Sequence, residues 1–381
     1  MKAIVETIGT RRIPAAAFPC RVTVVIIFLN ERQFLAEAIQ SVLSQTFLAW
    51  ELLLVDDGST DGSTDVAKRH AVTYSATIRY LDHPGHANRG MSASRNLGLA
   101  HARGEFVLFL DADDTIVPTT LDDQVTFMDA HPGVGTVYGP MRLWRSWNGS
   151  SRGGHVDGTT DLHLETDRVH DPVSVLTTFL LHEDAVPSGN LIRTEMARRI
   201  GGFEDEFTGM YEDQVFRVKL CRVAPSYVSS RIWYHYRQHS RSCCATMITE
   251  GKISAARARF LRWVKAYCRR HNVTDSLVRG TINRALRPYH YPRIAQWQSW
   301  CAQARRRWAW RLTEQITNIA RRWLPDRIWS FLRDRVKGSQ PGSDGRSTGT
   351  AGGTLPGAAS AAPLERATAH RAESKLIANE C

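Results

Sequence analysis

The 381-residue chain lacks several patterns by which whole classes of protein are recognised. Its seven cysteines form no Cys-x-x-Cys pair, and an odd number without a metal-type or disulfide-type spacing favours a reducing cytosol. No stretch approaches the ~18 consecutive apolar residues of a membrane-spanning helix, and the N-terminus lacks the apolar core of a secretory signal. We therefore expect a cytoplasmic protein without a transmembrane segment.

Acidic residues are scarce in one segment of the chain. Residues 252–337 contain 21 Lys and Arg against 4 Asp and Glu, whereas residues 1–251 contain 24 against 30. The positive net charge of the chain, +11, therefore arises in this one segment, whose own net charge is +17 from 21 basic and 4 acidic residues, and this indicates a surface partner for it. Two interpretations stay open. Either amphipathic helices pack on the rest of the protein and leave a solvated basic face, or their Arg and Trp side chains hold the protein peripherally on the anionic inner face of a membrane.

Glycine is absent from the turn that follows the first expected strand. The β-branched run from Val22 to Leu29 predicts a buried strand, and the next residues are Asn30, Glu31 and Arg32. A dehydrogenase would have Gly-x-Gly-x-x-Gly at this turn. A sugar nucleotidyltransferase would have a loop rich in glycine and basic residues. Both classes are therefore disfavoured.

Strands and helices alternate over about the first 110 residues. Four apolar runs predict buried strands, at 22–29, 50–55, 78–81 and 106–110. The segments between them have helical spacing, at 31–47, 63–69 and 92–102. Such alternation predicts a parallel sheet with right-handed crossovers.

Three of these strands end in polar or acidic side chains. The pairs Asn30-Glu31 and Asp56-Asp57 follow the first two strands, and Asp111 and Asp113 follow the fourth. Ligands of open α/β sheets bind outside the carboxyl ends of the strands, so we expect these groups to meet in one crevice. Because a buried carboxylate is costly unless it is paired or metal-bound, a divalent cation and a phosphorylated ligand are expected there. The alternative is an acidic turn in which Asp114 caps the next helix.

These motifs resemble those of the family 2 inverting glycosyltransferases, which have the GT-A fold. The resembling segments follow the family's order: Val24–Glu31, Leu54–Asp61, Ser92–Gly98, Gly104–Asp114 and Tyr211–Phe216. One departure is Ile27, where the family often has proline. The resemblance implies a metal-dependent, inverting transfer of a sugar from a nucleotide-diphosphate sugar, with a UDP-sugar favoured. The acceptor would be a hydroxyl of a glycan, glycolipid or other molecule, in the synthesis of a surface polysaccharide or glycolipid.

The resemblance also implies an α/β fold with a Rossmann-like, mostly parallel sheet flanked by helices. The expected organisation is a loose lead-in at 1–20, a GT-A domain at 21–245 with a nucleotide-binding half at 21–114 and an acceptor half at 115–245, a basic Trp-rich helical segment at 246–337, and a disordered tail at 338–381.

Individual residues take roles from the resemblance. Asp113 would be a ligand of Mn²⁺ or Mg²⁺, which prefer oxygen donors. Asp111 would reach the ribose or the water shell of the metal, and His239 would lie near the diphosphate or the metal. The expected donor-binding residues are Phe28, Asn30, Glu31, Asp56, Asp57, Arg95, Asp111 and Arg237, and the acceptor side would be lined by Ser188-Gly189-Asn190 and Trp144 to Trp147. For Arg95 the alternative is an ion pair on a helix surface.

Asp213 would be the general base that takes the proton of the acceptor hydroxyl. Glu212 beside it would make Asp213 a stronger base through like-charge proximity. The alternative is that both carboxylates only cap the helix that follows. A second class of function also stays open, namely a nucleotide- or nucleic-acid-binding protein that uses the basic segment without transferase activity. Three acidic strand ends in one crevice argue against it, so no nucleic acid is expected.

Overall fold

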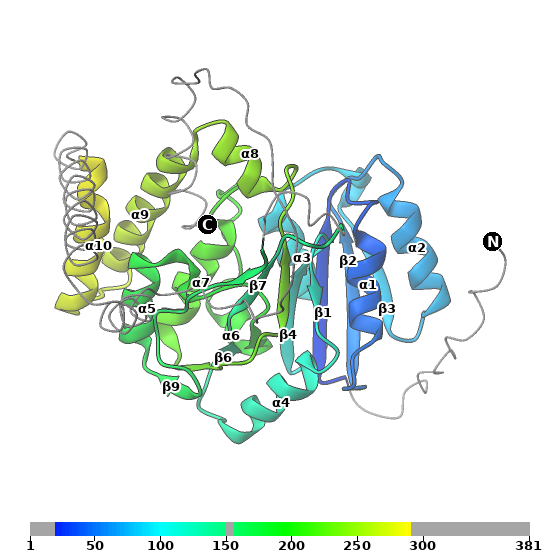
Figure 1. The fold of residues 1–381 in the computed structure, drawn as a ribbon, viewed down its shortest axis with the longest axis horizontal. Coiled ribbons are helices and arrows are strands. Elements are labelled where there is room, and N and C mark those ends of the chain that lie inside the picture. The colour runs from blue at the N-terminus through cyan, green and yellow to red at the C-terminus, as the bar shows by residue number, and fades with distance from the viewer. Residues whose placement is uncertain (1–19, 149–155, 291–381) are drawn as a thin grey trace, which may run out of the picture. The chain divides into compact units, whose positions relative to one another are not determined.

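The computed structural model describes residues 20–148 and 156–290, and within these ranges the fold is mixed α/β (Figure 1). An eight-stranded, mostly parallel sheet has the strand order β3-β2-β1-β4-β10-β6-β11-β9. Its strands are β1 (Val22–Phe28), β2 (Trp50–Asp56), β3 (Ile78–Asp82), β4 (Phe106–Asp111), β6 (Thr136–Tyr138), β9 (Arg168–His170), β10 (Leu191–Arg193) and β11 (Ser226–Val228). The predicted α/β fold class is thereby confirmed.

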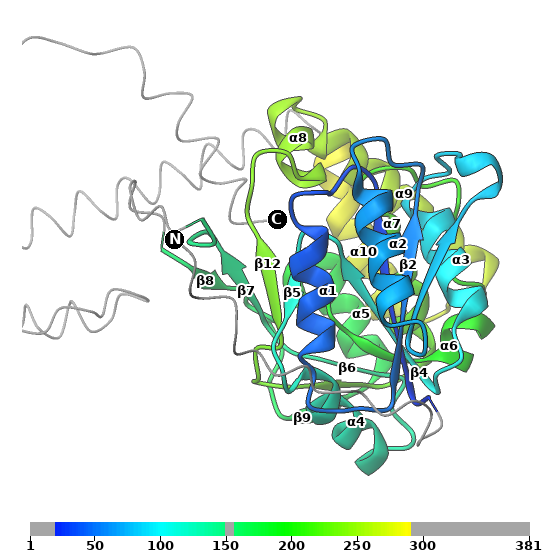
Figure 2. The same ribbon diagram turned by 90° about the vertical axis from the view of Figure 1, so that its right-hand side faces the viewer.

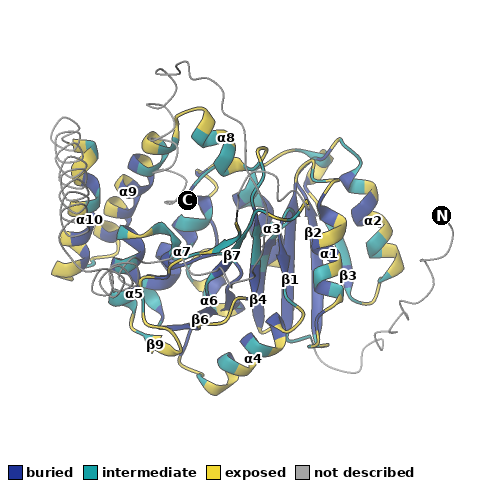
Figure 3. Cartoon of the chain, in the orientation of Figure 1, coloured by how far each residue is buried: buried dark blue, intermediate teal, exposed yellow. Residues whose placement is uncertain are grey.

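Helices cover both faces of this sheet. They are α1 (Leu35–Leu43), α2 (Ser63–Thr73), α3 (Met91–His101), α4 (Thr120–Ala130), α5 (Pro172–Leu181), α6 (Thr194–Arg199), α7 (Glu212–Val223), α8 (Cys243–Thr249), α9 (Ile253–Arg270) and α10 (Ser276–His290). Successive side chains of a strand point to opposite faces of the sheet. Val24 and Ile26 of β1 therefore pack in the core on the α1 side, whereas Val25 and Ile27 pack in the core on the side of α3 and α7. Burial on both faces explains why these strands have continuous apolar sequences (Figure 3).

The register of the parallel strands brings three strand ends to one edge. Phe28 lies opposite Asp56 on β2, and Ile27 lies opposite Asp111 on β4. The four predicted strands and their parallel order are therefore found in the structure. The first predicted helix is shorter than expected, because residues 31–34 form a turn before Leu35.

The second half of the chain differs more from the sequence-based expectation. β10 runs antiparallel between β4 and β6. α4 is preceded by a two-residue strand, β5 (Thr115–Ile116). β10 has three residues, which is too short to display a period, and the sequence pattern did not predict it.

A second, four-stranded sheet has the order β5-β12-β7-β8. It adds β7 (Met141–Trp144), β8 (Gly158–Thr159) and β12 (Tyr234–Arg237) to β5. Figure 2 shows it beside α1, with which β5 is in contact. Pairing of β12 with β5 returns the chain to the end of β4, more than 100 residues after it left.

The basic segment is described only as far as His290. Within it, the apolar stripe of α9 is buried, with Phe260, Trp263 and Val264 in the core. Phe260 contacts Phe179 of α5, which is the packing that the first interpretation of this segment required. The structure does not describe residues 1–19 of the lead-in expected at 1–20, the tryptophans from Trp297 to Trp329 or the tail at 338–381. The expected domain boundaries stay predictions. No helix of the described ranges is both long and apolar enough to cross a membrane.

Candidate active site

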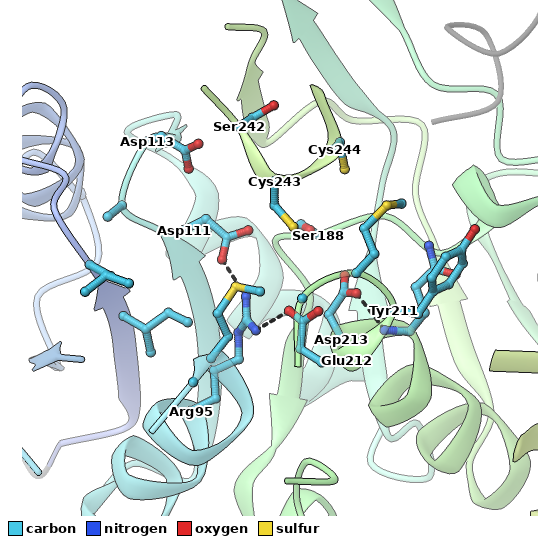
Figure 4. Close-up of a pocket in the computed structure, with 18 of the residues that line it drawn as sticks. Arg95, Asp111, Asp113, Ser188, Tyr211, Glu212, Asp213, Ser242, Cys243 and Cys244 are labelled. Carbon is cyan, nitrogen blue, oxygen red and sulfur yellow. Dashed lines mark hydrogen bonds and ion pairs between the residues drawn. The ribbon is translucent and has the colours of Figure 1, made fainter. Parts of the chain in front are cut away.

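A cleft of about 690 Å³ opens at the carboxyl ends of β1, β2 and β4. Phe28, Asp57 and Asp111 line it from the first half of the chain, and Glu212 and Asp213 line it from the second. Figure 4 shows Asp111 facing Glu212 and Asp213 across the cleft. Its size is in the range of small-molecule sites. Eight carboxylates and four arginines are among its lining residues, so the cleft is rich in negative charge.

Arg95 connects the two halves at the base of the cleft. Its Nη1 donates to Glu212 Oε1 at 2.6 Å, and its Nη2 donates to Asp111 Oδ1 at 2.8 Å. The side chain is almost fully buried, so the ion pair predicted as an alternative exists, but in the interior and not on a helix surface. Close packing of α3 on β1 makes this possible, because a Cβ on Gly98 would lie 2.4 Å from a methyl carbon of Val25.

Glu212 and Asp213 lie in different environments although they are adjacent. Burial, and next the charge of Asp213, raise the pKa of Glu212 to about 7, against the opposing effect of Arg95. The Asp213 side chain is 31% exposed and lines the cleft. Its Oδ1 accepts the backbone N–H of Gln214, and its Oδ2 pairs with Arg217 Nη2 at 2.7 Å. Asp213 therefore both contributes to the helix start and faces the cleft.

Arg217 is a cleft residue that the sequence analysis missed. It bridges Asp213 to Ser188, whose Oγ accepts from Arg217 Nη2 at 2.8 Å. The spacing of four residues between Asp213 and Arg217 was the available signal, since such pairs are neighbours on a helix. Of the acceptor-side residues predicted with Ser188, Gly189 packs against the ring of Tyr234.

Asp113 and His239 come together as the sequence predicted, with His239 Nε2 and Asp113 Oδ2 2.9 Å apart. Burial, followed by the charge of Asp113, raises the pKa of Glu31 to about 7. Among the described residues, no three His, Cys, Asp or Glu side chains converge as a ready metal-ligand cluster. Carboxylate and imidazole donors nevertheless fit Mn²⁺ or Mg²⁺ chemically, and the crowding of Glu31 against Asp113 creates negative charge that a cation would neutralise.

Asp114 is buried and does not cap the next helix, because α4 begins six residues later with Thr119 at its N-cap. Its carboxylate accepts hydrogen bonds from Tyr234 Oη at 2.8 Å and from the Arg237 backbone N–H at 2.7 Å. Burial, and then the charges of Asp113 and Asp111, hold its pKa well above the usual range. Asp114 thus fastens β12 to the end of β4.

Arg237, predicted as a donor-binding residue, lies behind the cleft and is not among its lining residues. Its side chain is 2% exposed, and its Nη2 pairs with Glu37 Oε2 at 2.7 Å. The guanidinium carbon lies 4.4 Å from the ring centre of Trp144 and 5.2 Å from that of Trp147. These tryptophans, predicted on the acceptor side, instead enclose a buried cation.

Asp56 also differs from its predicted role. It is fully buried, and its carboxylate accepts from Ser59 N, Thr64 Oγ1 and Tyr80 Oη at 2.8, 2.6 and 3.2 Å. These bonds build the turn after β2. Its neighbour Asp57 lines the cleft instead.

The remaining predicted donor residues lie at or beside the cleft. Asp57 accepts the backbone N–H groups of Arg89 and Gly90 at 2.7 and 3.0 Å. Phe28 and Glu31 line the cleft. Asn30 has a φ of 58° and directs its Oδ1 to the backbone N–H of Thr60, so it holds the neighbouring turn.

The sequence model of one known family, described as glycosyl transferase family 2, matches residues 23–187. Residues 23–187 therefore resemble a family 2 glycosyltransferase domain. The match begins in β1, includes the acidic end of β4 and stops at Pro187 in the cleft wall. The family resemblance seen in the sequence is thereby confirmed.

The curated relatives match less than a third of the chain. It is 40% identical over 111 residues to the putative glycosyltransferase EpsE of Bacillus subtilis (strain 168), covering 29% of this chain and 39% of EpsE. It is 38% identical over 102 residues to the cholesterol galactosyltransferase of Borreliella burgdorferi, covering 27% of each. The matched region thus spans less than half of either relative.

Among solved structures, the S. aureus TarS 1–349 complex with UDP is similar, with a TM-score of 0.51 and 20% identity. The superposition covers 70% of this chain and 69% of that chain. This likeness concerns the fold.

Proposed function

We propose that this protein transfers a sugar from a nucleotide-diphosphate sugar to an acceptor hydroxyl, with inversion at the anomeric carbon. One observation carries the proposal: a single cleft contains both the strand ends of a family 2 domain and an accessible carboxylate, Asp213, at the start of α7. The strand ends would bind the donor, and Asp213 would act on the acceptor.

The donor would lie in the cleft against Phe28, Glu31 and Asp57, and Asp111 would also line its site. We propose a UDP-sugar as the first donor to test, since a TarS structure of the same fold was determined with UDP. Asp56 and Asn30 would act on the donor indirectly, because their bonds shape the turns that carry Asp57 and Glu31.

A divalent ion, Mn²⁺ or Mg²⁺, would be held by Asp113 and His239, with Asp111 near its water shell. When bound, such an ion neutralises the diphosphate leaving group as a Lewis acid. The excess of carboxylates in the cleft supports this, because two phosphates would otherwise enter a negatively charged space.

Asp213 would be the general base. As the acceptor oxygen attacks the anomeric carbon, its proton would pass to a carboxylate oxygen of Asp213, and the bond to the diphosphate oxygen would break on the opposite face. Arg217 and the Gln214 N–H would fix the orientation of that carboxylate. Glu212 is buried against Arg95, so we assign it a positioning role.

The acceptor wall contains Met141, Thr160, Pro187 and Ser188. We propose a glycan, glycolipid or similar hydroxyl acceptor, within the synthesis of a surface polysaccharide or glycolipid. The name of one relative, a cholesterol galactosyltransferase, is compatible with an acceptor of lipid type.

The basic segment would hold the protein peripherally on the inner face of a membrane. Residues 252–290 contain ten Lys and Arg but one acidic residue, Asp275. On α9 the side chains of Arg262, Lys265 and Arg269 are exposed, whereas the apolar stripe is buried. The contact would therefore be electrostatic, without insertion of α9 into the lipid.

A donor screen tests the proposed function. The full chain is incubated with UDP-, GDP- and dTDP-sugars and Mn²⁺, and nucleotide release is measured with and without candidate acceptors. We expect one base to give release that depends on the acceptor and is lost in Asp213→Asn. Failure of every nucleotide to bind in calorimetry would contradict the proposal and favour a binding protein of another kind.

A further inference from the structure

We propose that α9, which lies outside the matched family region, positions the general base by holding the turn from which α7 begins. The positioning residues are Phe260 and Arg257, and they act through Tyr211. This inference rests on the proposed role of Asp213, and it assigns a specific task to the first helix of the basic segment.

Tyr211 has a backbone conformation that needs external support. Its φ of 75° and ψ of 5° lie in the left-handed region, which residues other than glycine rarely adopt. It is the N-cap residue of α7, and it makes no side-chain capping hydrogen bond there. A conformation of this kind persists only where the surroundings hold it. Because Glu212 and Asp213 follow directly, the direction of the Asp213 carboxylate depends on what holds Tyr211.

Two residues of α9, three positions apart, hold the two ends of the Tyr211 side chain. The Phe260 ring stacks on the Tyr211 ring, with centroids 5.1 Å apart and an interplanar angle of 19°. The Tyr211 hydroxyl lies 3.2 and 3.1 Å from the two carboxylate oxygens of Glu183. Glu183 is itself ion-paired with Arg257, and its side chain is 8% exposed. Figure 4 shows Tyr211 on the same side of the cleft as Asp213.

A second pair of α9 residues holds the segment just before this turn. Trp263 Nε1 donates to Glu206 Oε1 at 2.9 Å, and Arg259 Nη2 donates to the Glu206 carbonyl at 2.6 Å. The Trp263 ring also meets Phe207 edge-on, with centroids 5.8 Å apart. The next residues, 208–211, form part of the cleft wall. α9 therefore contacts both ends of the wall segment 208–211. It holds Glu206 and Phe207 just before the segment, and it holds Tyr211 at the end of the segment.

These contacts predict a selective defect when they are removed. Without the ring stack, Tyr211 can leave the left-handed conformation, and Asp213 then moves relative to the acceptor hydroxyl. Reaction rates are sensitive to such displacements, which cost about 100-fold for 1 Å. Phe28, Asp57 and Asp113 come from the opposite side of the cleft and have no part in this network. Turnover should therefore fall while donor binding is retained.

The test uses Phe260→Leu in the full chain, beside Val264→Ala as a matched control. Val264 is equally buried on α9 and lies about one helical turn after Phe260. We expect Phe260→Leu to lower turnover at saturating donor and acceptor by at least about tenfold, with donor affinity in calorimetry changed by less than about threefold. Val264→Ala should lower the melting temperature without a comparable loss of turnover.

Arg257 provides a milder test that spares the core. Arg257→Ala should also lower turnover selectively, and Arg257→Lys, which can still pair with Glu183, should recover part of it. If Phe260→Leu and Val264→Ala lose turnover equally for an equal loss of melting temperature, or if Arg257→Ala leaves turnover unchanged, α9 is structural cover and the inference is wrong.

Asp213→Asn, measured in parallel, separates this inference from the proposed function. Loss of turnover in Asp213→Asn with normal turnover in Phe260→Leu and Arg257→Ala would overturn the role of α9 alone. Normal turnover in Asp213→Asn would overturn the proposed base, and with it the inference that α9 positions that base.

Discussion

Arg95 and Glu212 are 117 residues apart in the chain, yet Arg95 Nη1 lies 2.6 Å from Glu212 Oε1. Arg95 belongs to α3, in the part of the chain expected to bind the donor, and Glu212 is the first residue of α7. Since Arg95 also pairs with Asp111, one guanidinium joins the end of β4 to the helix that carries Asp213. The relative position of the two halves of the cleft therefore depends on a buried ion pair.

Breaking this pair on one side should be costly. Arg95→Met leaves two carboxylates without their partner, and losing one member of a buried pair typically costs roughly 3–5 kcal/mol. The free energy of unfolding in urea should fall by that order at pH 8. The double variant Arg95→Met with Glu212→Gln should lose less than the sum of the single losses. Additive losses would show that the pair is not coupled.

The raised pKa of Glu212 predicts the direction of a pH effect. The folded protein binds the Glu212 proton more tightly than the unfolded chain does, where the pKa is 4.5. The contribution of this group to stability is therefore full below pH 4.5 and is lost as the pH rises toward about 7. The difference in free energy of unfolding between Glu212→Gln, which does not titrate, and the parent should shift in favour of the variant as the pH rises from about 5 to about 8. If this is wrong, the difference in free energy of unfolding between Glu212→Gln and the parent, measured in urea, will be the same at about pH 5 and at about pH 8.

Asp113→Asn should weaken Mn²⁺ binding and remove most of the activity without unfolding the protein. The variant keeps the shape of the side chain but deletes a charged oxygen donor. The measurements are Mn²⁺ titration by calorimetry, turnover and melting temperature. Asp122→Asn on the exposed side of α4 is the control and should change none of them. Unaltered Mn²⁺ dependence in Asp113→Asn would exclude it as a ligand.

Asp213→Asn and Asp57→Asn should separate catalysis from donor binding. Loss of a general base typically lowers the rate by ~10²–10⁴-fold, so turnover should fall by that order in Asp213→Asn with donor affinity nearly unchanged. Asp57→Asn should weaken donor binding and leave turnover intact at saturation, because Asp57 acts on the donor side of the cleft. If Asp213→Asn loses both quantities together, Asp213 belongs to the nucleotide or metal site.

Binding to a membrane surface should depend on the exposed charges of α9. Deleting residues 252–381 would also remove the buried Phe260 and Val264, so charge reversal is the cleaner change. Arg262→Glu with Lys265→Glu should reduce sedimentation with anionic vesicles, and salt should weaken the binding of the parent. Neutral vesicles are the control. Absence of binding by the parent at low salt would leave the basic face as solvated cover.

The sequence by itself determined the central sheet and the position of its acidic edge. β1, β2 and β4 are buried on both faces, so their continuous apolar runs are visible without any knowledge of their neighbours. Parallel pairing then requires that their carboxyl ends meet, which is why Asp57, Asp111 and Asp113 could be predicted to share one cleft. β10 in the second half was not predicted, because its three residues display no period.

Only the tertiary structure decided which polar groups face the cleft and which support it. The sequence shows that Arg95, Asp114 and Arg237 lie next to recognisable motifs, but their partners are Glu212, Tyr234 and Glu37, each more than 100 residues away. A buried charge must find a partner wherever packing brings one within reach, and that partner has no fixed spacing in the chain. For the same reason, the contact of α9 with Tyr211 could be seen only after the chain had folded.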